Sequence, residues 1–100
     1  MDVPVAVSGE VAGQGVMRLT VSGDLDMVAG KSLARTMVRA ATGGGVARLV
    51  VDLEHVTSVD ACGVRALLVG HEVALRRGVA FQVINPPGPI RRILEITHLT

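Results

Sequence analysis

The middle of the chain reads Val46-Ala47-Arg48-Leu49-Val50-Val51-Asp52-Leu53. This stretch is rich in β-branched residues and almost continuously apolar, a pattern typical of a strand that is covered on both faces or lies centrally in a parallel sheet. We therefore predict that residues 46–53 form the central strand of the fold. Leu49 and Val51 should be buried against the helix that follows.

A helix is predicted on each side of this strand. From Met27 the apolar residues recur with a helical period, and a glycine triplet at residues 43–45 ends the pattern. After the central strand, Asp60 stands at the position of an N-cap, and Gly78 ends the second helix. The predicted buried face of the first helix consists of Gly30, Leu33, Ala34, Met37 and Ala41, and that of the second consists of Val64, Leu67, Leu68, His71 and Leu75.

Two strands are predicted near the start of the chain. Residues 16–21 alternate between apolar and polar side chains, as a half-buried strand does. Residues 3–8 are apolar but contain Pro4, which places that strand at a sheet edge or starts it after the proline. Residues 9–15 should join the two strands as a hairpin.

The last part of the chain predicts one more strand and one more helix. Residues 79–84 have the pattern of a strand, and residues 85–89 form a proline-rich turn. The helix after this turn should bury Ile90, Ile93, Leu94 and Thr97. The order is therefore β-β-α-β-α-β-α, and right-handed crossovers make the later strands parallel. We predict one α/β domain over residues 1–100, with a mostly parallel sheet and an antiparallel first edge strand.

Composition excludes several classes of protein. With 100 residues, of which 49% are hydrophobic, the chain suits a single core. No apolar run approaches the ~20 residues of a membrane span and no signal peptide opens the chain, so we expect a soluble, cytoplasmic protein without membrane insertion. A net charge of +1 and one aromatic residue do not suit nucleic-acid binding. One cysteine and three scattered histidines predict no disulfide, no metal site and no cofactor.

Three polar groups follow the ends of predicted strands, and we expect them to converge. They are Gly23-Asp24-Leu25-Asp26, Asp60-Ala61-Cys62-Gly63 and Asn85-Pro86. The carboxyl ends of parallel strands share one edge of an open α/β sheet, and this edge is where such proteins place their functional groups.

Each group also has a purely structural interpretation. Asp24 and Asp26 could form an acidic patch for a partner or for a metal ion held by a kinase, or they could be a turn residue and an N-cap. Cys62 could be a reactive thiol, because a helix N-terminus favours the thiolate, or a small packed residue. His55 and His98 have the pattern of surface positions, whereas His71 falls at the edge of the core.

The order and spacing of four motifs resemble the STAS domain of anti-sigma factor antagonists, small bacterial proteins that bind anti-sigma factors. Gly23-Asp24-Leu25-Asp26 corresponds to the family's Gly-Glu-Leu-Asp, and residues 59–64 correspond to its Asp-Ser-Ser-Gly-Leu. Residues 50–53 match the family's core strand, and Ile84-Asn85-Pro86 leads to the third helix at residues 90–94. The resemblance covers residues 16–99.

What the resemblance implies is a protein-binding module and not an enzyme. The start of the second helix and the loop around Asp26 would dock on a kinase-type anti-sigma factor with a histidine-kinase-like ATPase fold, and sequestering that factor would regulate sigma-dependent transcription. The implied contact residues are Asp24, Asp26, Asp60, Ala61, Cys62, Gly63, Val64 and Arg65.

The chain departs from the family pattern in two places. Phosphorylation in the family falls on the residue directly after the aspartate, and here that residue is Ala61, which has no hydroxyl group. The resemblance therefore implies an antagonist without the usual serine switch. Relatives also usually continue past the third helix with a further strand and helix. If they are lacking here, residues 79–84 become an exposed edge strand, through which two copies could pair as a homodimer.

Two other functions stay open from the sequence. Similar short STAS proteins serve as accessory subunits of lipid-transport ATPases or as scaffold units in stress-signalling assemblies, and this alternative changes the partner but keeps the fold. An enzyme that uses Cys62 as a nucleophile or redox sensor is the third class, but the sequence places no base near the thiol.

Overall fold

The computed structural model describes residues 6–11 and 13–96. The described residues form the strands β1 (Ala6–Val11), β2 (Val16–Leu25), β3 (Arg48–Val59) and β4 (Ala80–Ile84) and the helices α1 (Met27–Thr42), α2 (Ala61–Arg76) and α3 (Gly88–Ile96). The sheet has the order β1-β2-β3-β4, in which β1 is antiparallel to β2 and the other three strands are parallel. The predicted α/β class, the element order and the antiparallel first edge strand are confirmed.

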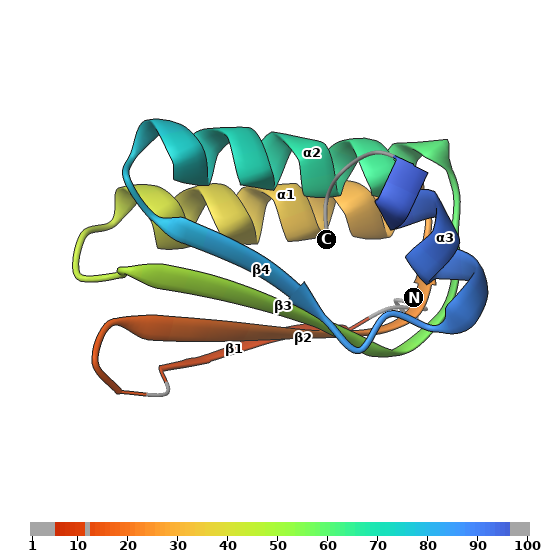
Figure 1. The fold of residues 1–100 in the computed structure, drawn as a ribbon, viewed down its shortest axis with the longest axis horizontal. Coiled ribbons are helices and arrows are strands. Elements are labelled where there is room, and N and C mark those ends of the chain that lie inside the picture. Colours follow the sequence, from red (N-terminus) through yellow and green to blue (C-terminus); the bar gives the residue numbers. More distant parts are fainter. Residues whose placement is uncertain (1–5, 12, 97–100) are drawn as a thin grey trace.

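The described residues form two layers (Figure 1). Helices α1 and α2 lie side by side on one face of the sheet, and α3 lies near the end where the parallel strands finish. Both long helices begin at this same end, because each follows directly on a parallel strand. The carboxyl ends of the strands and the N-termini of α1 and α2 therefore share one edge of the molecule.

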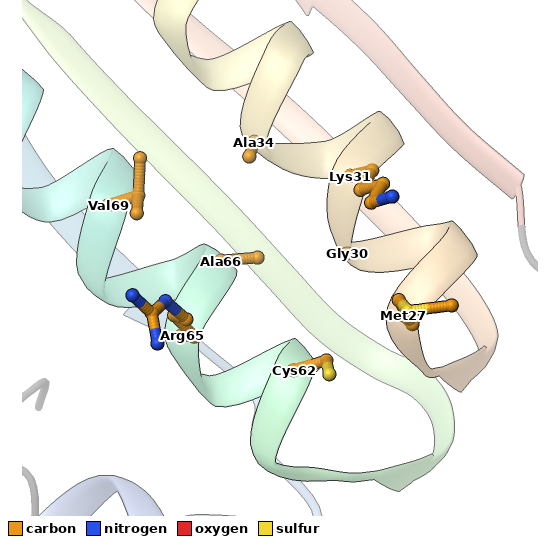
Figure 2. Close-up of a pocket in the computed structure, with 8 residues that line it drawn as sticks. All are labelled: Met27, Gly30, Lys31, Ala34, Cys62, Arg65, Ala66 and Val69. Atoms are coloured by element: carbon orange, nitrogen blue, oxygen red, sulfur yellow. The ribbon is translucent and has the colours of Figure 1, made fainter.

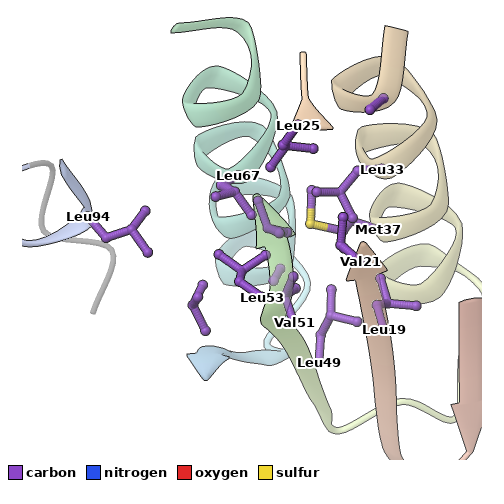
Figure 3. Close-up of a cluster of buried hydrophobic side chains, with 14 of the residues drawn as sticks. Leu19, Val21, Leu25, Leu33, Met37, Leu49, Val51, Leu53, Leu67 and Leu94 are labelled. Carbon is purple, nitrogen blue, oxygen red and sulfur yellow. The ribbon is translucent and has the colours of Figure 1, made fainter. Parts of the chain in front are cut away.

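The hydrophobic core lies between the sheet and the two long helices (Figure 3). Leu49 and Val51 of β3 and Leu67 of α2 are fully buried, as predicted. Other side chains that are fully buried there are Leu19, Val21, Leu33, Met37 and Leu53. Of the predicted face of α1, Gly30, Leu33, Met37 and Ala41 are buried and Ala34 is half-buried.

The predicted buried face of α2 is wrong by about one residue. Leu68 is 39% exposed and Leu75 is 72% exposed, whereas Val64 and His71 are half-buried. The buried residues are mostly small: Gly63, Ala66, Leu67, Gly70 and Ala74. The prediction followed the large apolar residues, but α2 contacts α1 closely through its small residues, such as Ala66 opposite Gly30 and Gly70 opposite Met37. His71 does lie at the edge of the core, where its ring centroid is 5.3 Å from that of Phe81.

Three strands extend further than their sequence patterns indicate. Residues 9–11, expected in the hairpin loop, belong to β1, and β3 continues to Val59. Strand β2 continues to Leu25 through two register irregularities, so residues 23–25 are not a turn after the strand. Pairing with β3 holds these polar residues in the ladder, which no local pattern reveals. The predictions for Pro4, Thr97 and His98 lie outside the described residues.

Candidate functional site

Asp24 lies at the end of β2, where its side chain joins two hydroxyl groups of β3. Its carboxylate accepts hydrogen bonds from Thr57 Oγ1 at 2.6 Å and from Ser58 Oγ at 2.8 Å. These two bonds hold the pKa of the exposed Asp24 carboxyl below its usual value. The sequence alone does not place Thr57 and Ser58 beside Asp24. The parallel register that sets Asp24 opposite Ser58 does.

Asp26 and Asp60 cap the two long helices. Asp26 Oδ1 accepts a hydrogen bond of 3.0 Å from the Ala29 N–H, and Asp60 Oδ1 accepts one of 2.9 Å from the Gly63 N–H. The structural interpretation of Asp26 as an N-cap is therefore confirmed, and such a cap typically contributes ~1 kcal/mol. Both carboxylates also remain at the common edge where α1 and α2 begin.

The first turn of α2 sits directly on the end of β2. The Asp60 N–H donates to the Leu25 carbonyl oxygen at 3.3 Å. A Cβ atom added to Gly63 would lie 2.3 Å from the same oxygen and 2.7 Å from Val59 Cγ2. Only glycine fits at this position, so the close approach of helix and strand explains Gly63 without any contact to a partner.

The contact between the first turn of α2 and the end of β2 determines which residues of α2 face outward. Ala61, Cys62 and Arg65 are exposed, and Val64 is half-buried. The interpretation of Cys62 as a packed residue is wrong, because the thiol lies on the surface. A shallow groove between α2 and α3 is lined by Asp60, Ala61, Val64, Arg65, Leu68 and Ile93. Several of the predicted contact residues therefore lie together on one accessible surface.

Asn85, the third predicted polar group, belongs to a different cluster. Its Nδ2 donates to Asp52 Oδ1 at 3.3 Å, and its φ of 54° is in the left-handed region. Asp52, which is buried, also accepts hydrogen bonds from the Arg18 guanidinium at 2.5 Å and from the Glu54 N–H at 3.0 Å. Burial would raise the pKa of Asp52, but these bonds and the Arg18 charge hold it below its usual value. Asn85 thus ties the β4–α3 turn to the sheet.

Within residues 6–11 and 13–96, no three side chains of His, Cys, Asp or Glu are grouped so that they could hold a metal ion. None of the helices in these ranges has the length and the apolar character needed to cross a membrane.

Residues 8–100 match the family model described as "Mlab, STAS domain". The chain therefore belongs to the STAS domain family. Because the match covers nearly the whole chain, it includes the first turn of α2 and also Asp24 with its partners Thr57 and Ser58.

Solved structures with the same fold include two kinds of protein. An anti-sigma factor antagonist from Mycobacterium paratuberculosis is 28% identical, with a TM-score of 0.79 over 95% of this chain and 79% of that chain. The anti-sigma factor antagonist SpoIIAA in its unphosphorylated form is 19% identical, with a TM-score of 0.80 over 94% of this chain and 82% of that chain. The murine anion transporter Slc26a9 is 19% identical, with a TM-score of 0.70 over 94% of this chain but only 18% of its own. The fold therefore does not define the function by itself.

Proposed function

We propose that this STAS domain is an anti-sigma factor antagonist, which binds a kinase-type anti-sigma factor in the cytoplasm and thereby regulates sigma-dependent transcription. The observation that carries the proposal is the exposed first turn of α2, with Ala61, Cys62 and Arg65 next to the acidic edge that contains Asp24. The 28% identity to an anti-sigma factor antagonist over 95% of the chain supports it. The chemistry proposed is binding, without catalysis.

The proposed contact surface combines charge with apolar area. Asp24, Asp26 and Asp60 provide negative charge at the helix N-termini, and Arg65 provides a positive charge one turn into α2. Val64 and Leu68 line the groove beside α3 together with Asp60 and Arg65. Interfaces of this kind obtain specificity from the placed charges and affinity from the apolar residues that they surround.

We further propose that this binding is constitutive. Ala61 occupies the exposed position at which the family resemblance places a phosphorylated serine, and it has no acceptor oxygen. A phosphate group there would add a charge of about −1.5 to −2 next to the Asp60 carboxylate, and the resulting repulsion would release a partner. Without an acceptor, the kinase activity of the partner cannot switch the complex off by this route.

Affinity capture from native cells tests the proposed partner. Tagged wild type should retain a protein with a histidine-kinase-like ATPase fold, identified by mass spectrometry. Arg65→Glu should lose it, whereas Arg39→Glu, an equal charge reversal at an exposed position of α1, should retain it. Both variants should unfold within ~0.5 kcal/mol of wild type, because the side chains are exposed. Capture of an ABC-type ATPase in place of the kinase-like protein would contradict the proposal and favour a transport accessory subunit.

We also propose that two copies can pair through β4. In the described sheet, β4 has a neighbour, β3, on one side only. An unpaired strand edge exposes backbone donors and acceptors that a second chain can use. Sedimentation equilibrium should then show a dimer at high protein concentration, and a monomer at every concentration would contradict this expectation.

A further inference from the structure

The exposed surface of α1 and α2 is strongly basic. Helix α1 contains no acidic residue, and α2 contains only Glu72, which is paired with Arg76 at 2.6 Å. The exposed cations of the two helices and of the residue that caps α2 are Lys31, Arg35, Arg39, Arg65, Arg76 and Arg77. Since the whole chain carries a net charge of only +1, the positive charge is concentrated on this helical layer.

A groove of about 340 Å³ lies between the two helices on this surface (Figure 2). Its lining is mostly small or apolar: Met27, Gly30, Ala34, Cys62, Ala66 and Val69. The groove exists because α1 and α2 touch through small residues. A Cβ added to Gly30 would lie 3.1 Å from the Cys62 carbonyl oxygen and 3.4 Å from Ala66 Cβ. The small residues at this contact leave space above it.

Two cations line the groove from opposite sides. Lys31 projects from α1 and Arg65 from α2 (Figure 2). Neither forms an ion pair with any residue in the described ranges. Met27 is 54% exposed and Val69 is 38% exposed, so apolar surface and positive charge are accessible at the same place. A ligand that fills the groove must therefore have apolar side chains that contact the lining and carboxylates that pair with Lys31 and Arg65.

We propose that this groove between α1 and α2 is a second docking surface and that it binds an acidic amphipathic helix of a partner protein. The apolar residues of such a helix would enter the recess, and its flanking carboxylates would pair with Lys31 and Arg65. A recessed lining suits side chains from a helix better than it suits a flat anionic membrane, which requires apolar groups that protrude. The surface shares Arg65 with the groove beside α3 but includes Lys31, which that groove does not.

Nuclear magnetic resonance titration of the full chain, labelled with ¹⁵N, tests this proposal with two synthetic helical peptides. Both carry leucine at helical spacing, and one is flanked by glutamate and the other by lysine. The glutamate peptide should shift the amide signals of Gly30, Ala34 and Ala66, and the shifts should weaken with added salt. The lysine peptide should leave these signals unchanged.

Matched variants separate the charge from the apolar lining. Lys31→Glu should weaken binding of the glutamate peptide about tenfold, and Arg39→Glu on the same helix should not. Val69→Gln should also weaken binding, whereas Leu75→Gln, which changes a 72% exposed leucine of the same helix outside the groove, should not. The spectrum of each variant reports whether it is folded.

Several outcomes would overturn the proposal. They are equal binding of the two peptides, no binding of either, shifts confined to other surfaces, or equal losses in Lys31→Glu and Arg39→Glu. Binding to vesicles of anionic phospholipid that depends on Lys31, without peptide binding, would assign the surface to a membrane and reject a protein helix. Because the probe is a peptide and Lys31 lies outside the groove beside α3, these results do not decide whether the chain binds an anti-sigma factor.

Discussion

Replacing Gly63 with alanine should destabilise the fold, although alanine is the better helix former. In an open helix position, the change from glycine to alanine stabilises by about 1 kcal/mol. At Gly63, however, the added Cβ would lie 2.3 Å from the Leu25 carbonyl oxygen, whereas ordinary van der Waals contact begins at 3.4 Å. Helix α2 or the end of β2 must therefore move by about 1 Å, since 3.4 − 2.3 = 1.1.

The magnitude follows from which atoms must move. The Leu25 oxygen is a backbone atom that accepts a hydrogen bond from the Asp60 N–H, so it cannot rotate away as the end of a side chain can. Overpacking of this kind costs up to ~3 kcal/mol, which exceeds the gain in helix propensity by about 2 kcal/mol. For a domain of this size, that loss lowers the Tm by about 8–16 °C.

Thermal unfolding followed by circular dichroism measures this effect, and Gly70→Ala provides the matched control in the same helix. There the added Cβ would approach Met37 Sδ at 2.4 Å and Met37 Cε at 2.6 Å, but these atoms end a flexible side chain that can repack. Gly70→Ala should therefore change stability by less than ~1 kcal/mol. A Gly63→Ala protein as stable as wild type, or less affected than Gly70→Ala, would refute the seating of α2 on β2.

Three further changes test the core, the buried carboxylate and the missing switch. Leu67→Ala should cost ~2–5 kcal/mol in a denaturant titration, whereas Leu68→Ala should cost less than ~1 kcal/mol because Leu68 is 39% exposed; equal losses would place the wrong face of α2 in the core. The lowered pKa of Asp52 stabilises the folded state above the unfolded value of ~3.9, and this contribution is lost as the pH falls through the folded pKa. Asp52→Asn should be less stable than wild type at pH 7, and its stability should fall less between pH 5 and pH 2; parallel acid unfolding curves would contradict this. With the proposed kinase-type partner and ATP, Ala61→Ser should accept a phosphate and then bind that partner more weakly, as measured by intact mass and titration calorimetry; a phosphate on Thr57 or Ser58 of wild type that weakens binding would disprove the proposed constitutive binding.

Much of the candidate site could be located from the sequence, but its internal contacts could not. The N-cap roles of Asp26 and Asp60 follow from their positions before helical patterns, and the structure shows both bonds. The pairing of Asp24 with Thr57 and Ser58 spans more than thirty residues and depends on the register of β2 against β3. A one-residue slip in that register would place Asp24 opposite a different residue of β3, and no local signal specifies the register.

The sequence by itself determines the element order, the central strand with Leu49 and Val51, and the helix starts, because hydrophobic periodicity and capping act within a few residues. Only the tertiary structure decides which face of α2 is buried. That choice depends on how closely α2 approaches its two neighbours. Gly30 and Gly70 lie at its contact with α1 and Gly63 lies at its contact with the end of β2, and the larger apolar residues that dominate the pattern do not set these contacts. The same close packing leaves Leu68 exposed, holds the first turn of α2 against the end of β2 and leaves the groove between the two helices. These three features depend on how two surfaces fit together, so the sequence of one segment does not reveal them.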